Sequence, residues 1–300
     1  MKRLSPITAL MVLAYSITTV SCQNGQGSAN PPVFWDGGTI PDPVFRAYVL
    51  GRFDTDRNGK ISREEADAVF AIDVDAETAD TPLIESLTGV EYFKNLGKLT
   101  CNWNNLAALD LSENTALTKL FCGYNPLTEL DVSRNTKLTE LLCHENQLTA
   151  LDLTHNTALA TVYCPNNRLT ALDLSKNTAL ATLACSRNQL TALDLSQNTA
   201  ITELYCNNNQ LAALDLSRNT ALTELYCNGN RLTTLDLSRN TELTKIYCDD
   251  NPLTELNISN LSKIEEIVFG DNPEINVIAN SQTVVSDEVR HYMDGKRKTP

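Results

Sequence analysis

The chain has 300 residues, of which 42% are hydrophobic and 20% are charged, and its formal net charge is −13. This composition is too apolar for a disordered acidic chain, so it predicts one large folded domain or two small ones. The negative charge argues against nucleic acid as a partner, because phosphate backbones are bound mainly by lysine and arginine.

The amino-terminal end has the features of an export signal. Lys2 and Arg3 precede an apolar stretch that is too short and too polar to span a bilayer. The stretch ends in Ser21 and Cys22, which resembles the lipobox of bacterial lipoproteins, although Thr19 stands where leucine is usual. The resemblance implies a lipid anchor on Cys22 and a place in the envelope of a Gram-negative bacterium, as an outer-membrane lipoprotein on the surface or periplasmic face. An ordinary cleaved signal peptide and a secreted protein are the alternative.

A calcium-binding loop is predicted in the stretch DTDRNGKISREE, residues 54–65. Its oxygen-bearing side chains and its glycine have the spacing of the EF-hand loop. In that loop, side chains, one backbone carbonyl and a bidentate glutamate supply the oxygens that Ca²⁺ requires. The predicted ligands are Asp54, Asp56, Asn58, the backbone carbonyl of Lys60, Ser62 and Glu65.

Apolar residues at helical spacing lie on both sides of this loop, which predicts a helix before it and a helix after it. EF-hands usually occur in pairs, but the following stretch DVDAETADTPLI does not supply a second loop. Thr78 stands where glycine is needed, and Ile84 stands where the bidentate acid should be. We therefore expect a single hand whose apolar helix faces pack against the rest of the chain, with calcium holding this cap in place.

A repeat of 21 residues fills most of the remaining chain. Each unit reads L-x-x-L-x-C-x-x-N-x and then L-x-x-L-D-L-S-x-N-T-x. The pattern resembles the leucine-rich repeat family, in a short bacterial class in which both halves echo L-x-x-L-x-L-x-x-N. The resemblance covers roughly residues 84–279 and implies a solenoid of stacked coils with short parallel β-strands. The coils start near Leu96, Leu117, Leu138, Leu159, Leu180, Ile201, Leu222, Leu243 and Ile264.

The alternation within each half supports this architecture independently. Leu99 and Cys101 in the first half, and Leu109 and Leu111 in the second, are expected to point inward from two short strands. A single coil has too few neighbours to bury its leucines, so the coils must stack. The predicted divisions are a signal peptide at 1–22, a tether at 23–40, the EF-hand at 41–75, an amino-terminal cap at 76–95, the repeats at 96–279, and a carboxyl-terminal cap and tail at 280–300.

One cysteine per coil is expected to lie in a buried column. Equivalent Cβ atoms on stacked parallel strands are about 4.8 Å apart and point the same way, which does not suit a disulfide. The three histidines show no register with the cysteines that would favour a metal ladder. The column is therefore interpreted as packing, and it consists of Cys101, Cys122, Cys143, Cys164, Cys185, Cys206, Cys227 and Cys248, with Phe269 in the last coil.

Polar residues recur with the same period. Two asparagine columns are expected to satisfy backbone groups where the chain bends. An outward aspartate column predicts a hydrogen-bonded, solvated ladder, with a cation-binding stripe as the alternative. The aspartates are Asp110, Asp131, Asp152, Asp173, Asp194, Asp215 and Asp236, and Asn257 ends the series.

The outward positions of the first predicted strand differ between coils, and five of the nine are aromatic. Exposed aromatic side chains on a solenoid favour a surface that binds a protein or a glycan. The alternative is a cross-strand ladder that only stabilises the sheet. The predicted contact residues are Trp103, Phe121, Tyr124, Tyr163, Tyr205, Tyr226 and Tyr247.

No catalytic motif stands out from the repeat background, so we do not expect an enzyme. The favoured function is that of an exported, lipid-anchored, calcium-binding protein that binds a protein or glycan partner as a monomer. A calcium-stabilised structural spacer without a dedicated ligand is the alternative.

Overall fold

A computed structural model describes residues 40–76, 78, 80–270 and 275–279 of the chain. All of these residues belong to one compact unit, Val33–Pro300. The predicted signal peptide, the lipidation site Cys22, nearly all of the tether and the carboxyl-terminal tail lie outside the described residues. Within the described part of the chain, no helix is long and apolar enough to cross a membrane.

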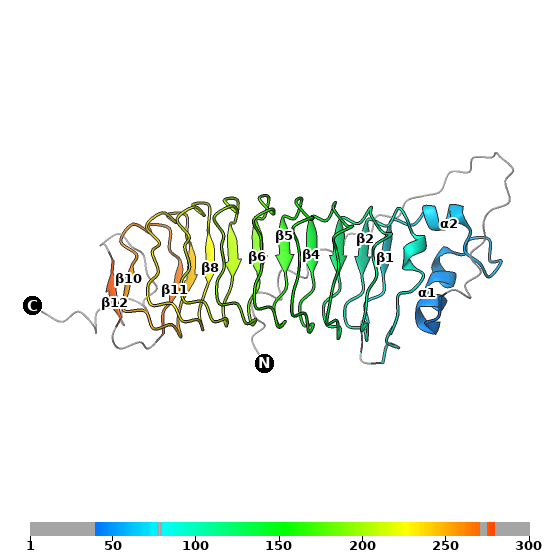
Figure 1. Ribbon diagram of the computed structural model, residues 1–300, viewed down its shortest axis with the longest axis horizontal. Coiled ribbons are helices and arrows are strands. Elements are labelled where there is room, and N and C mark those ends of the chain that lie inside the picture. Colours follow the sequence, from blue (N-terminus) through cyan, green and yellow to red (C-terminus); the bar gives the residue numbers. More distant parts are fainter. Residues whose placement is uncertain (1–39, 77, 79, 271–274, 280–300) are drawn as a thin grey trace, which may run out of the picture. The chain divides into compact units, whose positions relative to one another are not determined.

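Two helices precede the repeats (Figure 1). Helix α1 spans Pro43–Phe53 and begins after Asp42, whose side chain accepts hydrogen bonds from two backbone amides of the first turn. Helix α2 spans Arg63–Asp67 and begins after Ser62, which forms a reciprocal capping box with Glu65. The helix that was expected after the loop is thus only five residues long.

The repeats form a ten-stranded parallel sheet whose strands stand side by side in chain order (Figure 1). Each strand has three residues with a buried residue at its centre, and equivalent residues of neighbouring repeats are paired, as Leu99 is with Leu120. The strands are β1 (Ala71–Asp73), β2 (Lys98–Thr100), β3 (Lys119–Phe121), β4 (Glu140–Leu142), β5 (Thr161–Tyr163), β6 (Thr182–Ala184), β7 (Glu203–Tyr205), β8 (Glu224–Tyr226), β9 (Lys245–Tyr247) and β11 (Glu266–Val268).

The sheet begins earlier than the first repeat. Strand β1 lies inside the range predicted for the EF-hand, and it pairs in register with β2. A short 3-10 helix, η3 (Val90–Tyr92), lies in the stretch between these two strands that was predicted as a cap. The helical end of the chain is therefore joined to the solenoid by backbone hydrogen bonds as well as by packing.

The second half of each coil differs from the prediction. Among the described residues it forms paired strands only near the carboxyl end, where β10 (Glu255–Asn257) pairs with β12 (Asn276–Ile278). In the other coils the expected alternation of burial is present, since Asp110 is exposed and Leu111 is buried. The prediction of strands there was wrong, because the second halves of these coils do not pair with their neighbours through a backbone ladder, although their burial alternates.

Buried leucines and cysteines fill the interior of the coils. The eight cysteines of the repeats are buried free thiols, and Phe269 takes the same slot in the last coil with 6% of its surface exposed. The prediction of a packed, unbridged column is confirmed. Burial raises the pKa of these thiols, to about 12 at Cys164 and Cys206, so they stay protonated and apolar.

The first asparagine column joins each coil to the coil before it. The Nδ2 group of Asn125 donates to the carbonyl of Cys122 in its own coil (3.2 Å) and to that of Cys101 one coil earlier (3.0 Å). Its Oδ1 accepts from the backbone amide of Leu106, at 3.0 Å. These side chains satisfy backbone groups that the bend would leave without a partner, as the sequence predicts.

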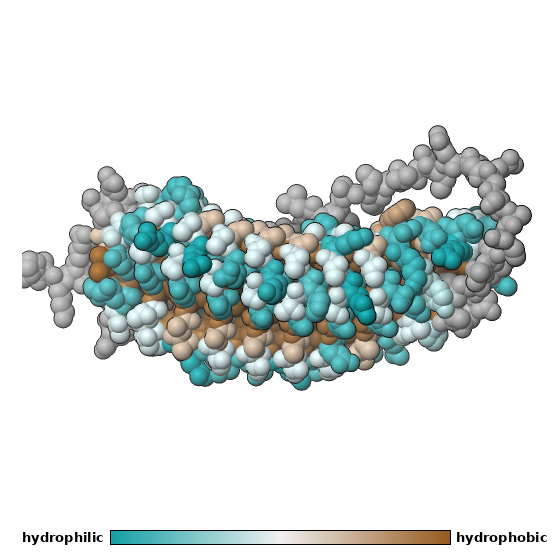
Figure 2. Space-filling model, turned by 45° about the horizontal axis from the view of Figure 1, so that its top comes forward, coloured by the Kyte–Doolittle hydropathy of each residue, from teal (hydrophilic) through white to brown (hydrophobic). Residues whose placement is uncertain are grey.

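The repeat also organises the surface. Figure 2 shows an apolar stripe that runs across successive coils and is bordered by hydrophilic residues. A period that matches one turn of the solenoid places the same kind of side chain at the same place in every coil. Differences between coils are therefore the positions to search for a binding site.

Candidate binding face and calcium loop

Nine strands of the sheet, β2 to β9 and β11, present one outward row of side chains at their third position. We call the surface around this row the first-strand face. Thr100 and Ala184 are buried in this row. The other members are half-buried, which leaves part of each side chain open to solvent: Phe121, Leu142, Tyr163, Tyr205, Tyr226, Tyr247 and Val268.

Three tyrosines form a stacked ladder on β7, β8 and β9. The ring centroids of Tyr205 and Tyr226 are 4.7 Å apart, and those of Tyr226 and Tyr247 are 4.5 Å apart with an interplanar angle of 10°. The hydroxyl of Tyr205 donates to Glu224 at 3.0 Å, and that of Tyr247 donates to Glu266. The ladder is therefore held by stacking and by fixed hydroxyl groups.

Charged side chains line this ladder, and the sequence analysis did not single them out. Lys245 Nζ lies 2.7 Å from Glu224 Oε1. Burial, and then the carboxylate of Glu224, raise the pKa of Glu203. Burial is also the main cause of the raised pKa of Tyr226, so the tyrosine hydroxyls remain neutral donors. The sequence does contain a signal for these charged groups, since Lys, Glu or Thr occupies the first position of every strand from β2 to β9 and of β11.

A second aromatic cluster lies towards the amino-terminal end of the sheet. Trp103 stacks on Tyr124 with ring centroids 3.3 Å apart, and 51% of Trp103 is exposed. His144 stands edge-on between Tyr124 and Tyr163, with centroid distances of 4.9 and 5.0 Å. Ala184 separates this cluster from the tyrosine ladder. The predicted contact residues thus fall into two groups, apart from Phe121.

Phe121 has a different neighbour. The Nζ atom of Lys98 lies 5.3 Å from the centroid of its ring, which is within the range of a cation–π contact. On the next strands, Lys119 pairs with Glu140 at 2.7 Å. The amino-terminal end of the face therefore presents lysine side chains beside its aromatic ring.

The sequence analysis did not assign His144 to this cluster. It is 4% exposed, and neither ring nitrogen has a hydrogen-bond partner within the described part of the chain. Burial lowers its pKa to about 4, so the ring is neutral near pH 7. A Cβ atom on Gly123 would lie 2.4 Å from the His144 ring, so the glycine makes room for the imidazole. The signal in the sequence was this glycine, one repeat before the histidine.

The backbone that carries Trp103 and Tyr124 is in the left-handed region. Their φ angles are 60° and 54°. The equivalent residues of later coils are Glu145, Asn166 and Arg187, with φ between 52° and 53°. Large aromatic residues are uncommon in this conformation, which asparagine and glycine adopt more readily. The turn itself is required by every coil, whereas the two aromatic rings are specific to the first two.

The predicted calcium ligands lie close together after α1. Carboxylate oxygens of Asp54, Asp56 and Glu65 all lie within 4.8 Å of one another. Asp54 accepts from the backbone amides of Asn58 (3.0 Å) and Gly59 (2.8 Å). The φ of 79° at Gly59 supplies the turn that brings the two ends of the loop together.

Glu65 is held from both sides. One carboxylate oxygen accepts from the amide and hydroxyl of Thr55 (2.6 and 2.7 Å), and the other accepts from the amide and hydroxyl of Ser62 (2.8 and 2.9 Å). Burial alone would raise the pKa of Glu65, but these hydrogen bonds outweigh it and lower the pKa to about 2. The carboxylate is therefore ionised and oriented, as a cation ligand must be.

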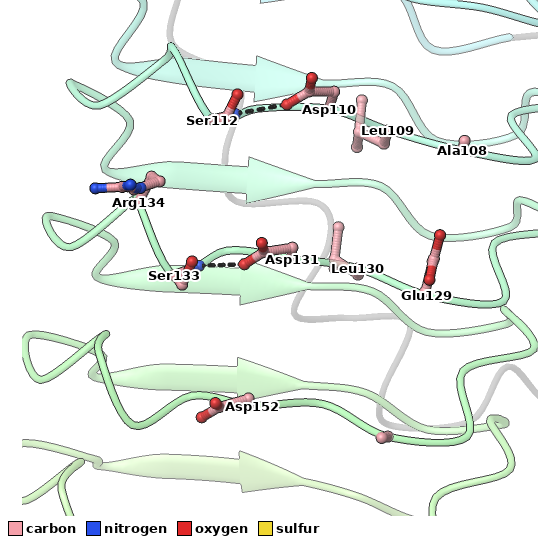
Figure 3. A pocket seen from close by; sticks show the side chains of 11 residues that line it. Ala108, Leu109, Asp110, Ser112, Glu129, Leu130, Asp131, Ser133, Arg134 and Asp152 are labelled. Carbon is pink, nitrogen blue, oxygen red and sulfur yellow. Dashed lines mark hydrogen bonds between the residues drawn. The ribbon is translucent and has the colours of Figure 1, made fainter.

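The first three members of the aspartate column line a pocket in the second halves of the coils. Figure 3 shows Asp110 and Asp131 bonded to the backbone amides of Ser112 and Ser133, at 2.9 and 2.8 Å, with Asp152 one coil farther along. The backbone bond is the main cause of the lowered pKa of Asp131. Within the described ranges, no three of these carboxylates are close enough to share one metal ion. The structure thus supports the hydrogen-bonded column.

Comparison with known proteins identifies similar solenoids. No family model matches the chain. Internalin J of Listeria monocytogenes is 38% identical over 76 residues, which are 25% of this chain and 8% of that protein. The solved functional domain of InlJ from Listeria monocytogenes, which includes a cysteine ladder, is 31% identical with a TM-score of 0.54, over 81% of this chain and 62% of that chain. The chain thus spans less than two thirds of either relative.

A third similarity concerns the fold alone. The solved internalin InlF of Listeria monocytogenes has a TM-score of 0.62 over 86% of this chain and 87% of that chain, at 21% identity. The chain therefore shares its solenoid with proteins whose sequences differ at most positions.

Proposed function

Since the chain is a bacterial leucine-rich repeat protein with a solenoid of the internalin type, we propose that it is a binding protein and not an enzyme. It recognises a protein partner through the aromatic side chains of its first-strand face. The chain matches only part of the length of these relatives, so their partners are not assigned to it. The chemistry of the first-strand face indicates the kind of partner that fits.

One observation carries this proposal. The half-buried ladder of Tyr205, Tyr226 and Tyr247 stands on consecutive strands, with charged side chains fixed beside it. Tyrosine is enriched at protein interfaces because a large rigid ring and a hydroxyl are presented at a low cost in side-chain entropy. A ladder needed only for stability would be expected in every coil, whereas Ala184 interrupts the row.

The test is a triple variant, Tyr205→Ser, Tyr226→Ser and Tyr247→Ser. Proteins retained by the immobilised wild type should be lost from this variant, because each ring contributes contact area that serine lacks. A matched control carries three outward substitutions in the second halves of nearby coils, and it should retain the same proteins: Ala192→Ser, Ala213→Ser and Thr234→Ser.

Circular dichroism and melting temperature establish that both variants are folded. Retention of the same partners by the tyrosine variant, together with a lower melting temperature, would contradict the binding proposal. That result would favour a structural spacer. If the tyrosine variant loses a glycan ligand but retains the protein partners, the face binds a glycan and not a protein.

A second proposal concerns calcium. We propose that Asp54, Asp56, Asn58, the carbonyl of Lys60, Ser62 and Glu65 bind Ca²⁺, and that the ion stabilises the attachment of α1 to the solenoid. The clustering of three carboxylates supports it, and so do two contacts of α1. The Phe53 ring lies 5.6 Å from that of Phe93, and the Tyr48 hydroxyl accepts a bond from the amide of Asp73 in β1 at 3.1 Å.

Calorimetry with calcium and with a chelator tests the metal proposal. EF-hand modules of extracellular proteins bind with Kd of about 10⁻⁴ to 10⁻³ M. At a concentration 100 times Kd, binding stabilises the folded state by about 2.7 kcal/mol. The Glu65→Gln variant should lose this increase, since it removes the bidentate charged ligand. A calcium-dependent melting temperature that persists in Glu65→Gln would refute the assignment.

We further propose that the protein acts in the bacterial cell envelope, attached through a lipid on Cys22. The lipobox resemblance at Ser21 and Cys22 supports this proposal. Metabolic labelling with a fatty acid should mark the wild type and leave the Cys22→Ser variant unlabelled. Equal labelling of the wild type and the variant would contradict the anchor. A wild type that is exported without carrying label would favour an ordinary signal peptide.

A further inference from the structure

The carboxyl-terminal half of the first-strand face carries an excess of negative charge. The first positions of β7, β8, β9 and β11 are Glu, Glu, Lys and Glu, and two aspartates follow β9 after Cys248. All of these side chains are half-buried or exposed, so their charges act at the surface. The charged groups that act on the tyrosines of the ladder are Glu203, Glu224, Glu266 and Lys245. Asp249 and Asp250 lie on the loop after β9.

The single lysine does not neutralise this surface. Lys245 is committed to Glu224 at 2.7 Å, so this pair adds no net charge. No ion pair within the described ranges involves Glu203 or Glu266. Burial and then Glu224 raise the pKa of Glu203, and burial and Asp250 raise that of Asp249. The ionised form of a carboxylate in such a negative field is stabilised when a cation from outside approaches it.

The tyrosine ladder supplies a second feature that favours a cation. Its rings occupy three neighbouring strands, and two hydroxyls donate to Glu224 and Glu266, which fixes these carboxylates at the edge of the rings. Stacking covers the ring faces that the three tyrosines turn towards one another, so the carboxylates beside the rings are the main ligands for a cation. Arginine pairs with a carboxylate through two hydrogen bonds. The ladder and the carboxylates together therefore match a guanidinium or ammonium group better than an acidic or a purely apolar one.

The face is also polarised along the array. At its amino-terminal end Lys98 lies over Phe121, and Lys119 pairs with Glu140. At the first strand position, β2 to β6 carry Lys98, Lys119, Glu140, Thr161 and Thr182, so the unpaired glutamates of this position lie on β7 and β11. With neighbouring strands about 4.8 Å apart, this region spans on the order of 14 Å, which matches about four residues of an extended segment.

On the basis of the protein-binding function proposed above, we propose that the tyrosine ladder on β7–β9 and the carboxylates around it receive an extended, arginine- or lysine-rich segment of the protein partner. The segment crosses the strands, with its cationic groups against the carboxylates of Glu203 and Glu266, which form no ion pair within the described ranges. An acidic segment and a neutral segment are both disfavoured at this end of the face.

The experiment measures fluorescence anisotropy of labelled hexa-arginine, hexaglutamate and an uncharged Gly-Ser hexapeptide with the purified protein near physiological salt. The test variant is Glu203→Gln with Glu266→Gln. The matched control is Asp194→Asn with Asp215→Asn, which removes the same charge from the second halves of nearby coils. Asparagine preserves the local bond there, because Asn257 already accepts one from the Ser259 amide at 3.0 Å.

We expect hexa-arginine to bind the wild type, and the test variant to bind it about tenfold more weakly, since two carboxylates that contact the cations are lost. The control should change by less than about twofold, because distant exposed charges are screened. Equal losses in both variants would show attraction to the net charge of the protein and would overturn the proposal. Stronger binding of hexaglutamate or of the neutral peptide would overturn it as well.

Partner retention by the two variants separates the proposed binding face from the proposed basic segment. If the tyrosine variant loses its protein partners while Glu203→Gln with Glu266→Gln retains them, the binding face stands and the basic segment is refuted. If neither variant affects partner retention, the binding face itself is refuted.

Discussion

Replacing one asparagine of the first column should cost far more stability than replacing one of the second column. In the first column, Asn188 Nδ2 donates to the carbonyls of Cys164 (3.1 Å) and Cys185 (3.0 Å), and its Oδ1 accepts from the amide of Leu169 (3.0 Å). Asn188→Ala therefore leaves one buried donor and two buried acceptors without this partner. At about 1–3 kcal/mol for each unsatisfied group, with partial relief by water, we expect a loss of about 3–5 kcal/mol.

The second column provides the matched comparison. Asn177 donates to the carbonyls of Leu153 (3.1 Å) and Asn156 (2.8 Å). Both carbonyls also accept a backbone amide, from Asn156 and Leu159 respectively, at 3.0 and 3.1 Å. The Oδ1 atom of Asn177 has no hydrogen-bond partner within the described part of the chain. Asn177→Ala should therefore cost only about 1–2 kcal/mol.

Urea unfolding followed by circular dichroism measures both variants against the wild type. The slope of the transition must be compared as well, because repeat arrays do not always unfold in one step. An equal loss in the two variants, or a larger loss for Asn177→Ala, would refute the argument from backbone satisfaction.

Three further predictions concern the interior. Burial lowers the pKa of His144 to about 4, so protonation of the imidazole opposes folding, and the free energy of unfolding falls as pH decreases from about 6.5 towards 4. The melting temperature of His144→Phe should therefore depend less on pH between 7 and 4.5 than that of the wild type, and an unchanged pH dependence would contradict this. Gly123→Ala should lower stability by about 1–3 kcal/mol because its Cβ meets the imidazole, and equal loss in a His144→Ala background would exclude that contact as the cause. A thiol reagent should label the repeat cysteines only after denaturation, and rapid labelling of native Cys185 would contradict the buried column.

Most of the fold could be predicted from the repeat, because one period of the sequence corresponds to one turn of the solenoid. The inward positions of Leu99 and Cys101, the asparagine at each bend and the outward row of aromatic residues all follow from that period. The second halves were misjudged for a physical reason. Alternating burial occurs in any extended stretch, whereas a hydrogen-bonded strand also requires a neighbour at the correct spacing.

The chemistry of the face was less accessible. The sequence indicated the aromatic row and the alanine within it, but not the bond from Tyr205 to Glu224. Such contacts join residues 19 apart, almost one repeat, and depend on side-chain conformation as much as on register. His144 was overlooked for a related reason, since its place depends on the absence of a side chain at Gly123.

The in-register stacking of identical turns has an evolutionary consequence. Each turn bonds only to the turn before it and the turn after it, so loss or gain of 21 residues within the array re-forms the same contacts between new neighbours. Loss of the turn that contains Ala184 would bring Tyr163 beside Tyr205 and join two separate groups of rings into one. Recombination between repeats would thus change the proposed binding surface while the scaffold beneath it is preserved.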